Sequence, residues 1–217
     1  MKELPQTRTA EHSIGIPKTE RWLALGDSFT IGTGTTPDRA FPAVLTRLWA
    51  ERGRVVELRN PAVNGYRTED LIVEELPLIA VFQPTLMTIL IGANDIVAGS
   101  SDERYRQQLR TIHERVRADA PGATVYALPQ PDWSLSRAGA SFGAPAAIAA
   151  RIERFNATLR EETERAGAAY VDIFPLMRDQ MRRGMLAPDG LHPSAAAYAE
   201  WAEALRDRLA ARPASSP

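Results

Sequence analysis

Hydrophobic and polar positions follow two different periods along this chain. Five short runs rich in apolar and β-branched residues are typical of buried strands, and five longer stretches with apolar residues three or four positions apart are typical of helices. The strands are expected at residues 21–25, 55–60, 85–91, 123–128 and 168–173. The helices are expected at residues 39–51, 68–81, 102–118, 145–166 and 194–211, and Pro77 should kink or restart the second of them.

Strands and helices alternate, which predicts one parallel sheet with helices on both faces. We expect a single domain over residues 20–211, between an N-terminal tail (1–19) and a C-terminal tail (212–217). Ligands of such sheets bind beyond the carboxyl ends of the strands. We therefore expect catalytic or ligand-binding residues in the segments that follow the strands. The only long irregular segment among them is residues 129–144.

Ser28 directly follows the first expected strand, in the stretch WLALGDSFT. A serine in this position commonly caps a helix or forms a turn. It acts as a nucleophile only beside a positioned base, because the serine hydroxyl is weakly nucleophilic at its free pKa. The choice between the two interpretations depends on what the other strand-end segments carry.

The chain has three histidines, and only one of them follows a strand. His12 lies in the polar N-terminal tail, and His113 lies in an expected helix as a solvated or partly covered residue. Its sequence HERVR lacks the second histidine of a zinc-binding HExxH helix, so we expect no metal. His192, in PDGLHPS, has Asp189 three positions before it, where a turn can set the carboxylate against one ring nitrogen and leave the other as a base. A plain turn that caps the last helix explains the same residues.

Two further strand-end residues suit the stabilisation of an oxyanion. Gly65, in NGY after the second strand, can present its backbone N–H closely to a substrate. Asn94, in GAND after the third strand, can donate from its side-chain amide, although asparagine is commoner as a turn residue. One edge of the sheet would then carry a complete set of groups for acyl transfer: Ser28, Gly65, Asn94, Asp189 and His192.

Four short blocks, in order, resemble those of the SGNH hydrolases, also called the GDSL esterase/lipase family. The blocks are GDSFTIG, NPAVNG, GAND and DGLHP, and they extend over residues 26–193. The resemblance implies a three-layer α/β/α sandwich with a flavodoxin-like, five-stranded parallel sheet, and a hydrolase that acts on carboxylic esters without a cofactor. Phe29 stands where the family more commonly has leucine, which we interpret as a change in packing.

The resemblance also implies a role for each residue of the acyl-transfer set. Ser28 would be the nucleophile, His192 the base and Asp189 the acid that orients it. The oxyanion hole would consist of the backbone N–H groups of Ser28 and Gly65 and the side-chain amide of Asn94.

Two alternatives remain open at this point. GASFG, residues 139–143, matches the G-x-S-x-G elbow of α/β-hydrolases with Ser141 as nucleophile, but a loop and not a strand precedes it. The hydroxyl- and glycine-rich stretch SFTIGTGTT suits a flavin phosphate in a flavodoxin-like binding module, but no basic or aromatic residue nearby completes that site.

Composition narrows the partners further. A net charge of −1 indicates no nucleic-acid footprint, and no apolar run approaches the roughly 18 residues of a membrane span. The absence of cysteine excludes disulfides and thiolate metal sites. No export signal is visible, which favours the cytoplasm. The pattern does not predict an oligomeric state.

We expect the substrate to be a small acyl ester. The choice among such esters should depend on the loops at the strand ends, because no motif in the sequence indicates it. With one modest loop the site should be shallow and should prefer acyl groups from acetate to about hexanoate. Trp133 and Phe142 in that loop are expected to wall the pocket, although Trp133 fits the core equally well. Asp27, beside the nucleophile, is also expected to bind substrate.

Overall fold

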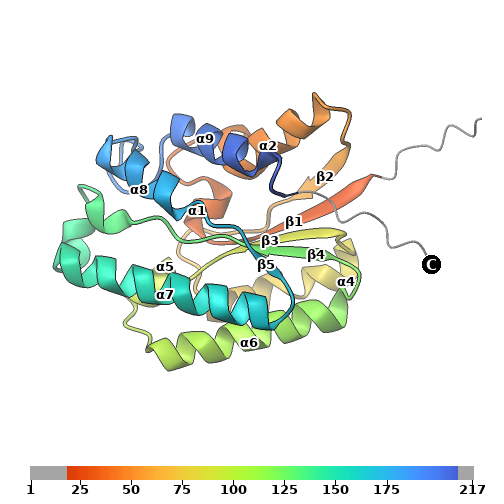
Figure 1. Cartoon of the computed structure of the whole chain (residues 1–217), viewed down its shortest axis with the longest axis horizontal. Coiled ribbons are helices and arrows are strands. Elements are labelled where there is room, and N and C mark those ends of the chain that lie inside the picture. The colour runs from red at the N-terminus through yellow and green to blue at the C-terminus, as the bar shows by residue number, and fades with distance from the viewer. Residues whose placement is uncertain (1–18, 210–217) are drawn as a thin grey trace, which may run out of the picture.

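The computed structural model describes residues 19–209, and its centre is a five-stranded sheet in the order β2-β1-β3-β4-β5 (Figure 1). The strands are β1 (Glu20–Gly26), β2 (Val56–Arg59), β3 (Leu86–Leu90), β4 (Thr124–Ala127) and β5 (Ala169–Tyr170). All neighbouring pairs run parallel. The parallel sheet predicted from the alternation of strands and helices is confirmed.

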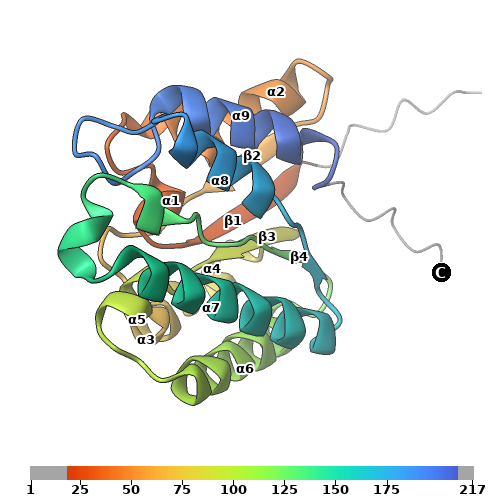
Figure 2. The same ribbon diagram turned by 60° about the vertical axis from the view of Figure 1, so that its left-hand side comes forward.

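The helices are α1 (Ser28–Ile31), α2 (Phe41–Ala50), α3 (Thr68–Asp70), α4 (Leu78–Phe82), α5 (Ala93–Val97), α6 (Asp102–Asp119), α7 (Pro145–Arg165), α8 (Phe174–Arg182) and α9 (Ala195–Arg206). Figures 1 and 2 show α2, α8 and α9 on one side of the sheet and α4, α6 and α7 on the other. The expected three-layer α/β/α sandwich is therefore confirmed.

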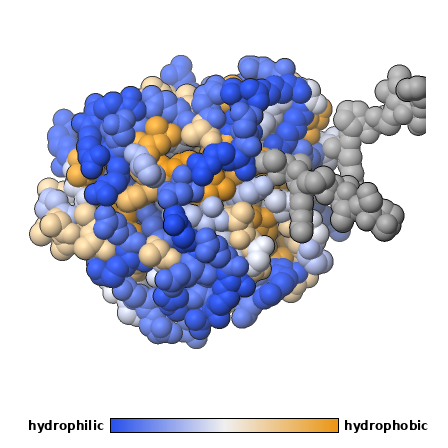
Figure 3. All heavy atoms as spheres, viewed as in Figure 1, coloured by the Kyte–Doolittle hydropathy of each residue, from blue (hydrophilic) through white to orange (hydrophobic). Residues whose placement is uncertain are grey.

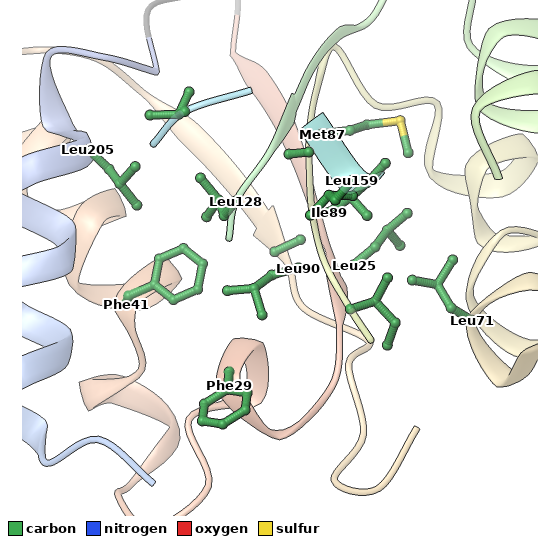
Figure 4. Close-up of a cluster of buried hydrophobic side chains, with 14 of the residues drawn as sticks. Leu25, Phe29, Phe41, Leu71, Met87, Ile89, Leu90, Leu128, Leu159 and Leu205 are labelled. Atoms are coloured by element: carbon green, nitrogen blue, oxygen red, sulfur yellow. The ribbon is translucent and has the colours of Figure 1, made fainter. Parts of the chain in front are cut away.

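The core forms where the two central strands meet both helical layers. Every residue of β3 is buried, as are the last five residues of β1. Figure 4 shows Leu25 and Leu90 from these strands among side chains of both layers, including Phe41 of α2 and Leu159 of α7. A parallel strand covered on both faces needs a nearly continuous apolar run, which is why these strands are predictable from the sequence.

Three helices lie outside the segments that were expected to be helical. α1 and α5 have only four and five residues, and α8 occupies part of a segment expected to be a strand-end loop. A helix of four or five residues is too short to display an apolar period, which is why α1 and α5 were not predicted. α8 has nine residues and buries Met177 and Met181, four positions apart, so its helical pattern was present in the sequence and was missed. Residues 129–144 contain two short 3₁₀ turns, Trp133–Leu135 and Gly139–Phe142.

The helix expected at residues 68–81 is broken. α3 continues into a π-helical turn (Leu71–Glu75), in which the N–H of Leu76 donates to the carbonyl oxygen of Leu71, and α4 begins after Pro77. The restart at Pro77 is as predicted. At the chain ends, the expected tails apart from residue 19 lie outside the described residues, as do His12 and the last two residues of the expected C-terminal helix.

The surface is mixed in character. Figure 3 shows a mostly hydrophilic face with small apolar patches between polar side chains. Val63, Val97 and Phe142 are large apolar residues that stay exposed, and each lies in a segment that follows a strand end. None of the helices between residues 19 and 209 combines the length and the apolar character needed to cross a bilayer.

Candidate active site

Ser28 lies where the chain leaves β1, an inner strand of the sheet. It is the first residue of α1, and Asp27 caps that helix by accepting a 3.0 Å hydrogen bond from the backbone N–H of Phe29. Gly26 has a φ of +155°, and a Cβ at this position would lie 2.3 Å from the carbonyl oxygen of Leu90. Glycine alone permits this turn, which brings Ser28 to the carboxyl edge of the sheet.

His192 and Asp189 form a hydrogen-bonded pair in the loop before α9. Nδ1 of His192 lies 2.8 Å from Oδ2 of Asp189, whose Oδ1 accepts from the backbone N–H groups of Leu191 and His192. Partial burial by itself would raise the pKa of Asp189, but these hydrogen bonds outweigh it and lower the pKa. An ionised Asp189 holds the proton on Nδ1, which leaves Nε2 of His192 as the candidate base.

Two neighbours restrict this pair, and the sequence analysis assigned a site role to neither. The Phe29 ring packs against the imidazole of His192 with ring centroids 5.4 Å apart, so the residue in place of the commoner leucine contacts the base directly. Gly34 packs closely against the loop that carries the pair. A Cβ on residue 34 would lie 2.5 Å from Cβ of Ala187 and 3.5 Å from Oδ2 of Asp189. A larger residue at position 34 would therefore displace the loop.

Ser28, Asn94 and His192 line one cavity of about 100 Å³. They come from α1, α5 and the loop before α9, which meet at the carboxyl edge of the sheet. The other residues that line the cavity are mostly apolar: Phe29, Asn64, Ala93, Val97, Trp133, Phe142 and Leu191. The structure thus brings the predicted nucleophile, base and amide donor together with both predicted aromatic wall residues.

Two of the three predicted oxyanion donors, Asn94 and Gly65, approach the cavity differently. Nδ2 of Asn94 donates to the carbonyl oxygen of Tyr66 at 2.9 Å, and because a primary amide has two N–H bonds, one remains for a ligand. Gly65 is exposed with a φ of +91°, and it follows Asn64, which lines the cavity. Gly65 therefore lies beside the cavity and not in its wall.

A buried pair ties the segments of these two donors together. Asp95 accepts hydrogen bonds from both the backbone N–H and the hydroxyl of Thr68, at 3.0 and 2.6 Å. Asp95 follows Asn94, and Thr68 lies three residues after Gly65, so the pair sets the distance between the donors. Neither Thr68 nor Asp95 was predicted from the sequence as a site residue, although the GAND block contains Asp95.

Asp27 differs from the sequence-based expectation. It has no exposed surface, it does not line the cavity, and one of its carboxylate oxygens caps α1. Its assignment as a substrate-binding residue is therefore wrong in this structure, because no ligand can reach it. The residue instead supports the turn that carries Ser28.

Ser141, the alternative nucleophile, lies in an exposed 3₁₀ turn. Its hydroxyl donates to the carbonyl oxygen of Ala138 at 2.6 Å, and Ser141 does not line the cavity. The strand that must precede the serine of an α/β-hydrolase elbow is absent before this turn. The structure therefore gives Ser141 neither the position nor the partners of a nucleophile.

His113 has no catalytic setting. It is buried in α6, and not solvated or partly covered as expected, with Nε2 3.2 Å from the hydroxyl oxygen of Thr163. Burial lowers the pKa of His113 to about 4, so the ring is neutral at physiological pH. Across residues 19–209, no three His, Asp or Glu side chains come together in a way that could hold a metal ion.

Similarity to known proteins agrees with this geometry. The model of the GDSL-like lipase/acylhydrolase family matches residues 24–200. The chain is 25% identical over 175 residues to Esterase TesA of Pseudomonas aeruginosa, a match that covers 81% of this chain and 80% of that protein. A stretch of 96 residues is 29% identical to thioesterase 1/protease 1/lysophospholipase L1 of Escherichia coli and covers 44% of this chain and 45% of that protein.

A solved structure shows the same fold. A lipase/acylhydrolase from Enterococcus faecalis superposes with a TM-score of 0.71 at 19% identity, over 90% of this chain and 100% of the other. The family model spans most of the domain, from β1 into α9. The chain belongs to the GDSL-like lipase/acylhydrolase family.

Proposed function

We propose that this protein hydrolyses carboxylic esters by way of an acyl intermediate on Ser28. Membership of the GDSL-like lipase/acylhydrolase family makes it an ester hydrolase, and one observation supports the route through Ser28. Ser28 and His192 line the same cavity, while Asp189 holds the other ring nitrogen of His192 at 2.8 Å. A serine hydroxyl becomes a useful nucleophile in this arrangement.

In the proposed reaction, Nε2 of His192 takes the proton of the Ser28 hydroxyl while Oγ attacks the ester carbonyl carbon. The tetrahedral intermediate then expels the alkoxide, which receives this proton from His192 and leaves as the alcohol. Water attacks the acyl-serine and gives a proton to His192, and Ser28 recovers that proton when the carboxylic acid departs. Asp189 stays ionised and stabilises the imidazolium that forms in each half of the reaction.

Three donors can stabilise the oxyanion of the tetrahedral intermediate. The backbone N–H of Ser28 lies in the first turn of α1, where an N–H has no intrahelical partner. The second N–H of Asn94 and the backbone N–H of Gly65 complete the proposed set. A preorganised donor of this kind contributes about 3 to 4 kcal/mol to the transition state.

The size of the cavity supports a small acyl group. Its volume of about 100 Å³ is well below the roughly 300–1,000 Å³ of pockets that enclose drug-sized ligands. Trp133 and Phe142 form one wall, with their rings edge to face at 5.6 Å, but Phe142 and Val97 are each about half exposed. Each methylene of the acyl chain contributes about 0.8 kcal/mol of binding free energy only where the cavity covers it. We therefore expect this contribution to end at about the length of a hexanoyl group.

A chromogenic ester panel graded from acetate to palmitate tests the substrate class, and a matched thioester series extends it. We expect kcat/KM to peak at or below hexanoate. A peak among long-chain esters would contradict the proposed acyl length. Labelling with an alkyl phosphonate tests the nucleophile, and a label found by mass spectrometry on any serine other than Ser28 would overturn the mechanism.

A further inference from the structure

Two buried carboxyl groups lie directly behind the nucleophile and have no part in the reaction proposed above. Asp27 has no exposed surface, and Glu75, at the end of the π-helical turn, is 1% exposed. Oε2 of Glu75 accepts a 3.0 Å hydrogen bond from the N–H of Gly26, and Oδ1 of Asp27 accepts one of 3.0 Å from the N–H of Phe29. Together the two carboxyls hold the backbone on both sides of Ser28.

The second oxygen of each carboxyl has no hydrogen-bond partner. Oδ2 of Asp27 and Oε1 of Glu75 are buried without a donor, and the hydroxyl of Thr30 is buried without a partner as well. An ionised carboxylate can only accept hydrogen bonds, and a buried polar atom without a partner is costly. The hydroxyl of Thr30 is one donor in this group, and a proton on one of the two acids supplies a second.

The surroundings offer no positive charge as an alternative to that proton. Within the described chain, the side-chain charges that act on Asp27 and Glu75 come from other acids. The further titratable groups around the two carboxyls are Tyr66, Asp95 of α5, Tyr105 of α6 and Tyr198 of α9. Ionisation of both carboxyls would therefore place two unbalanced negative charges behind Ser28.

Burial acts on both groups in the same direction. It raises the pKa of Asp27 to about 7, although the hydrogen bond from Phe29 opposes it. Burial also raises the pKa of Glu75 to about 8, with a further contribution from the charge of Asp27 and an opposing one from the hydrogen bond of Gly26. The charge of Asp95 also raises the pKa of Asp27, so each of the two acids titrates next to another buried acid.

We propose that Asp27 and Glu75 keep at least one proton between them at neutral pH and that this acid pair positions the turn carrying Ser28. The pair acts through the backbone of Gly26 and Phe29, so its members are positioning residues and do not touch substrate. Its effect on the rate rests on the proposed role of Ser28, whereas the retained proton does not. Loss of the proton at alkaline pH should distort the turn and lower kcat.

The sign of the effect on stability follows from the raised pKa values. Carboxyls of an unfolded chain titrate near about pH 4, so the folded state binds more protons than the unfolded state above that pH. The stabilisation by the protonated pair is complete below about pH 4 and is lost as the pH rises through 7 and 8. The folded protein should therefore lose stability towards alkaline pH.

Glu75→Gln tests the positioning role, because glutamine keeps an acceptor for Gly26 and carries a donor that cannot ionise. Glu74→Gln, an exposed neighbour, is the matched control. In the wild type and the control we expect kcat to fall roughly tenfold between pH 7 and pH 9. In Glu75→Gln that fall should shrink to less than about twofold, and the melting temperature should decline by about 5 °C less over the same interval. Identical profiles for all three proteins would overturn the proposal.

Infrared difference spectroscopy tests the retained proton on the wild type itself. The carbonyl band of a protonated carboxylic acid should persist to pH 7, where exposed carboxyls are ionised, and it should weaken in Glu75→Gln or, if that variant does not fold, in Asp27→Asn. Absence of the band in the wild type above pH 6 would overturn the proposal. A persistent band in a protein whose Ser28 no phosphonate labels would leave the acid pair standing and remove the proposed reaction instead.

Discussion

The two sides of the candidate active-site cavity differ in secondary structure, although both contain buried residues, Trp133 among them. The turn that carries Ser28 leaves a buried strand, and residues 22–30 are buried without interruption. The wall that carries Trp133 and Phe142 belongs to residues 129–144, which contain only short 3₁₀ turns and leave Phe142 about half exposed. The proposed chemistry lies on the side built from a buried strand, and the proposed acyl selectivity lies on the side that can change without disturbing the sheet.

The wall is joined to the rest of the site at a few defined points. Oδ2 of Asp132, which is buried, forms a 3.0 Å ion pair with Nε of Arg178 on α8. The N–H of Ala138 donates to the carbonyl oxygen of Gly190, in the loop that carries His192, at 3.1 Å. We therefore expect substitutions in the turn to change the rate for every substrate, and substitutions in the wall to change the preference among substrates.

The largest effect should come from comparing one serine on each side. Ser28→Ala should lower kcat for ester hydrolysis by roughly three to six orders of magnitude, because it removes the group that forms the acyl intermediate. Ser141→Ala, in the wall, should change kcat by less than about twofold, because Ser141 does not line the cavity. The reverse pattern in an ester-hydrolysis assay would reject Ser28 as the nucleophile.

The next effect concerns the oxyanion and still belongs to the side of the proposed chemistry. Asn94→Ala should lower kcat by about 10² to 10³ with little change in KM, because the oxygen becomes anionic only in the transition state. Asn94→Asp is the control, since a carboxylate that only accepts hydrogen bonds would face the oxyanion. A folded Asn94→Asp variant with near-native turnover would show that Asn94 is only a turn residue.

Local sequence patterns suffice to predict the sheet and to bring together much of the proposed catalytic set. The apolar runs of β1 and β3 place Ser28 and Asn94 at strand ends, and Asp189 and His192 are close enough for one loop to pair them. Where the predictions fail, tertiary packing decides the outcome. Asp27 is next to Ser28 in the sequence, yet the residues packed around Asp27 separate its side chain from the cavity.

The sequence predicts the burial of Glu75 but not the residue that it contacts. It lies four residues after Leu71 and four before Ile79, both buried, and this spacing places a carboxyl on the apolar face of the segment. The π-helical turn that ends at Glu75 shifts the helical register, and no local pattern says that the side chain meets Gly26 of a distant strand. The acid pair is visible only in three dimensions.

A smaller effect is expected at the attachment of the wall to α8. Arg178→Ala leaves the buried carboxylate of Asp132 without its cation, at a cost of about 1 to 3 kcal/mol of unfolding free energy, because Arg178 itself is partly exposed. KM for hexanoate should rise several-fold while kcat for acetate stays within about twofold. Arg182→Ala, exposed on the same helix, is the control in denaturant unfolding. Equal stability of the two variants would show that the ion pair does not hold the wall.

The smallest effect is the sharpest test of the division between the two sides. Phe142 covers only the outer part of the proposed acyl site, so Phe142→Ala should leave kcat/KM for acetate unchanged. For hexanoate it should lower kcat/KM by roughly 4- to 15-fold, which corresponds to the loss of one or two covered methylenes at about 0.8 kcal/mol each. Leu135→Ala removes a similarly exposed apolar side chain from the same segment outside the cavity and should change neither value. Equal losses for acetate and hexanoate in Phe142→Ala would mean that the wall positions the catalytic groups and does not select the acyl chain.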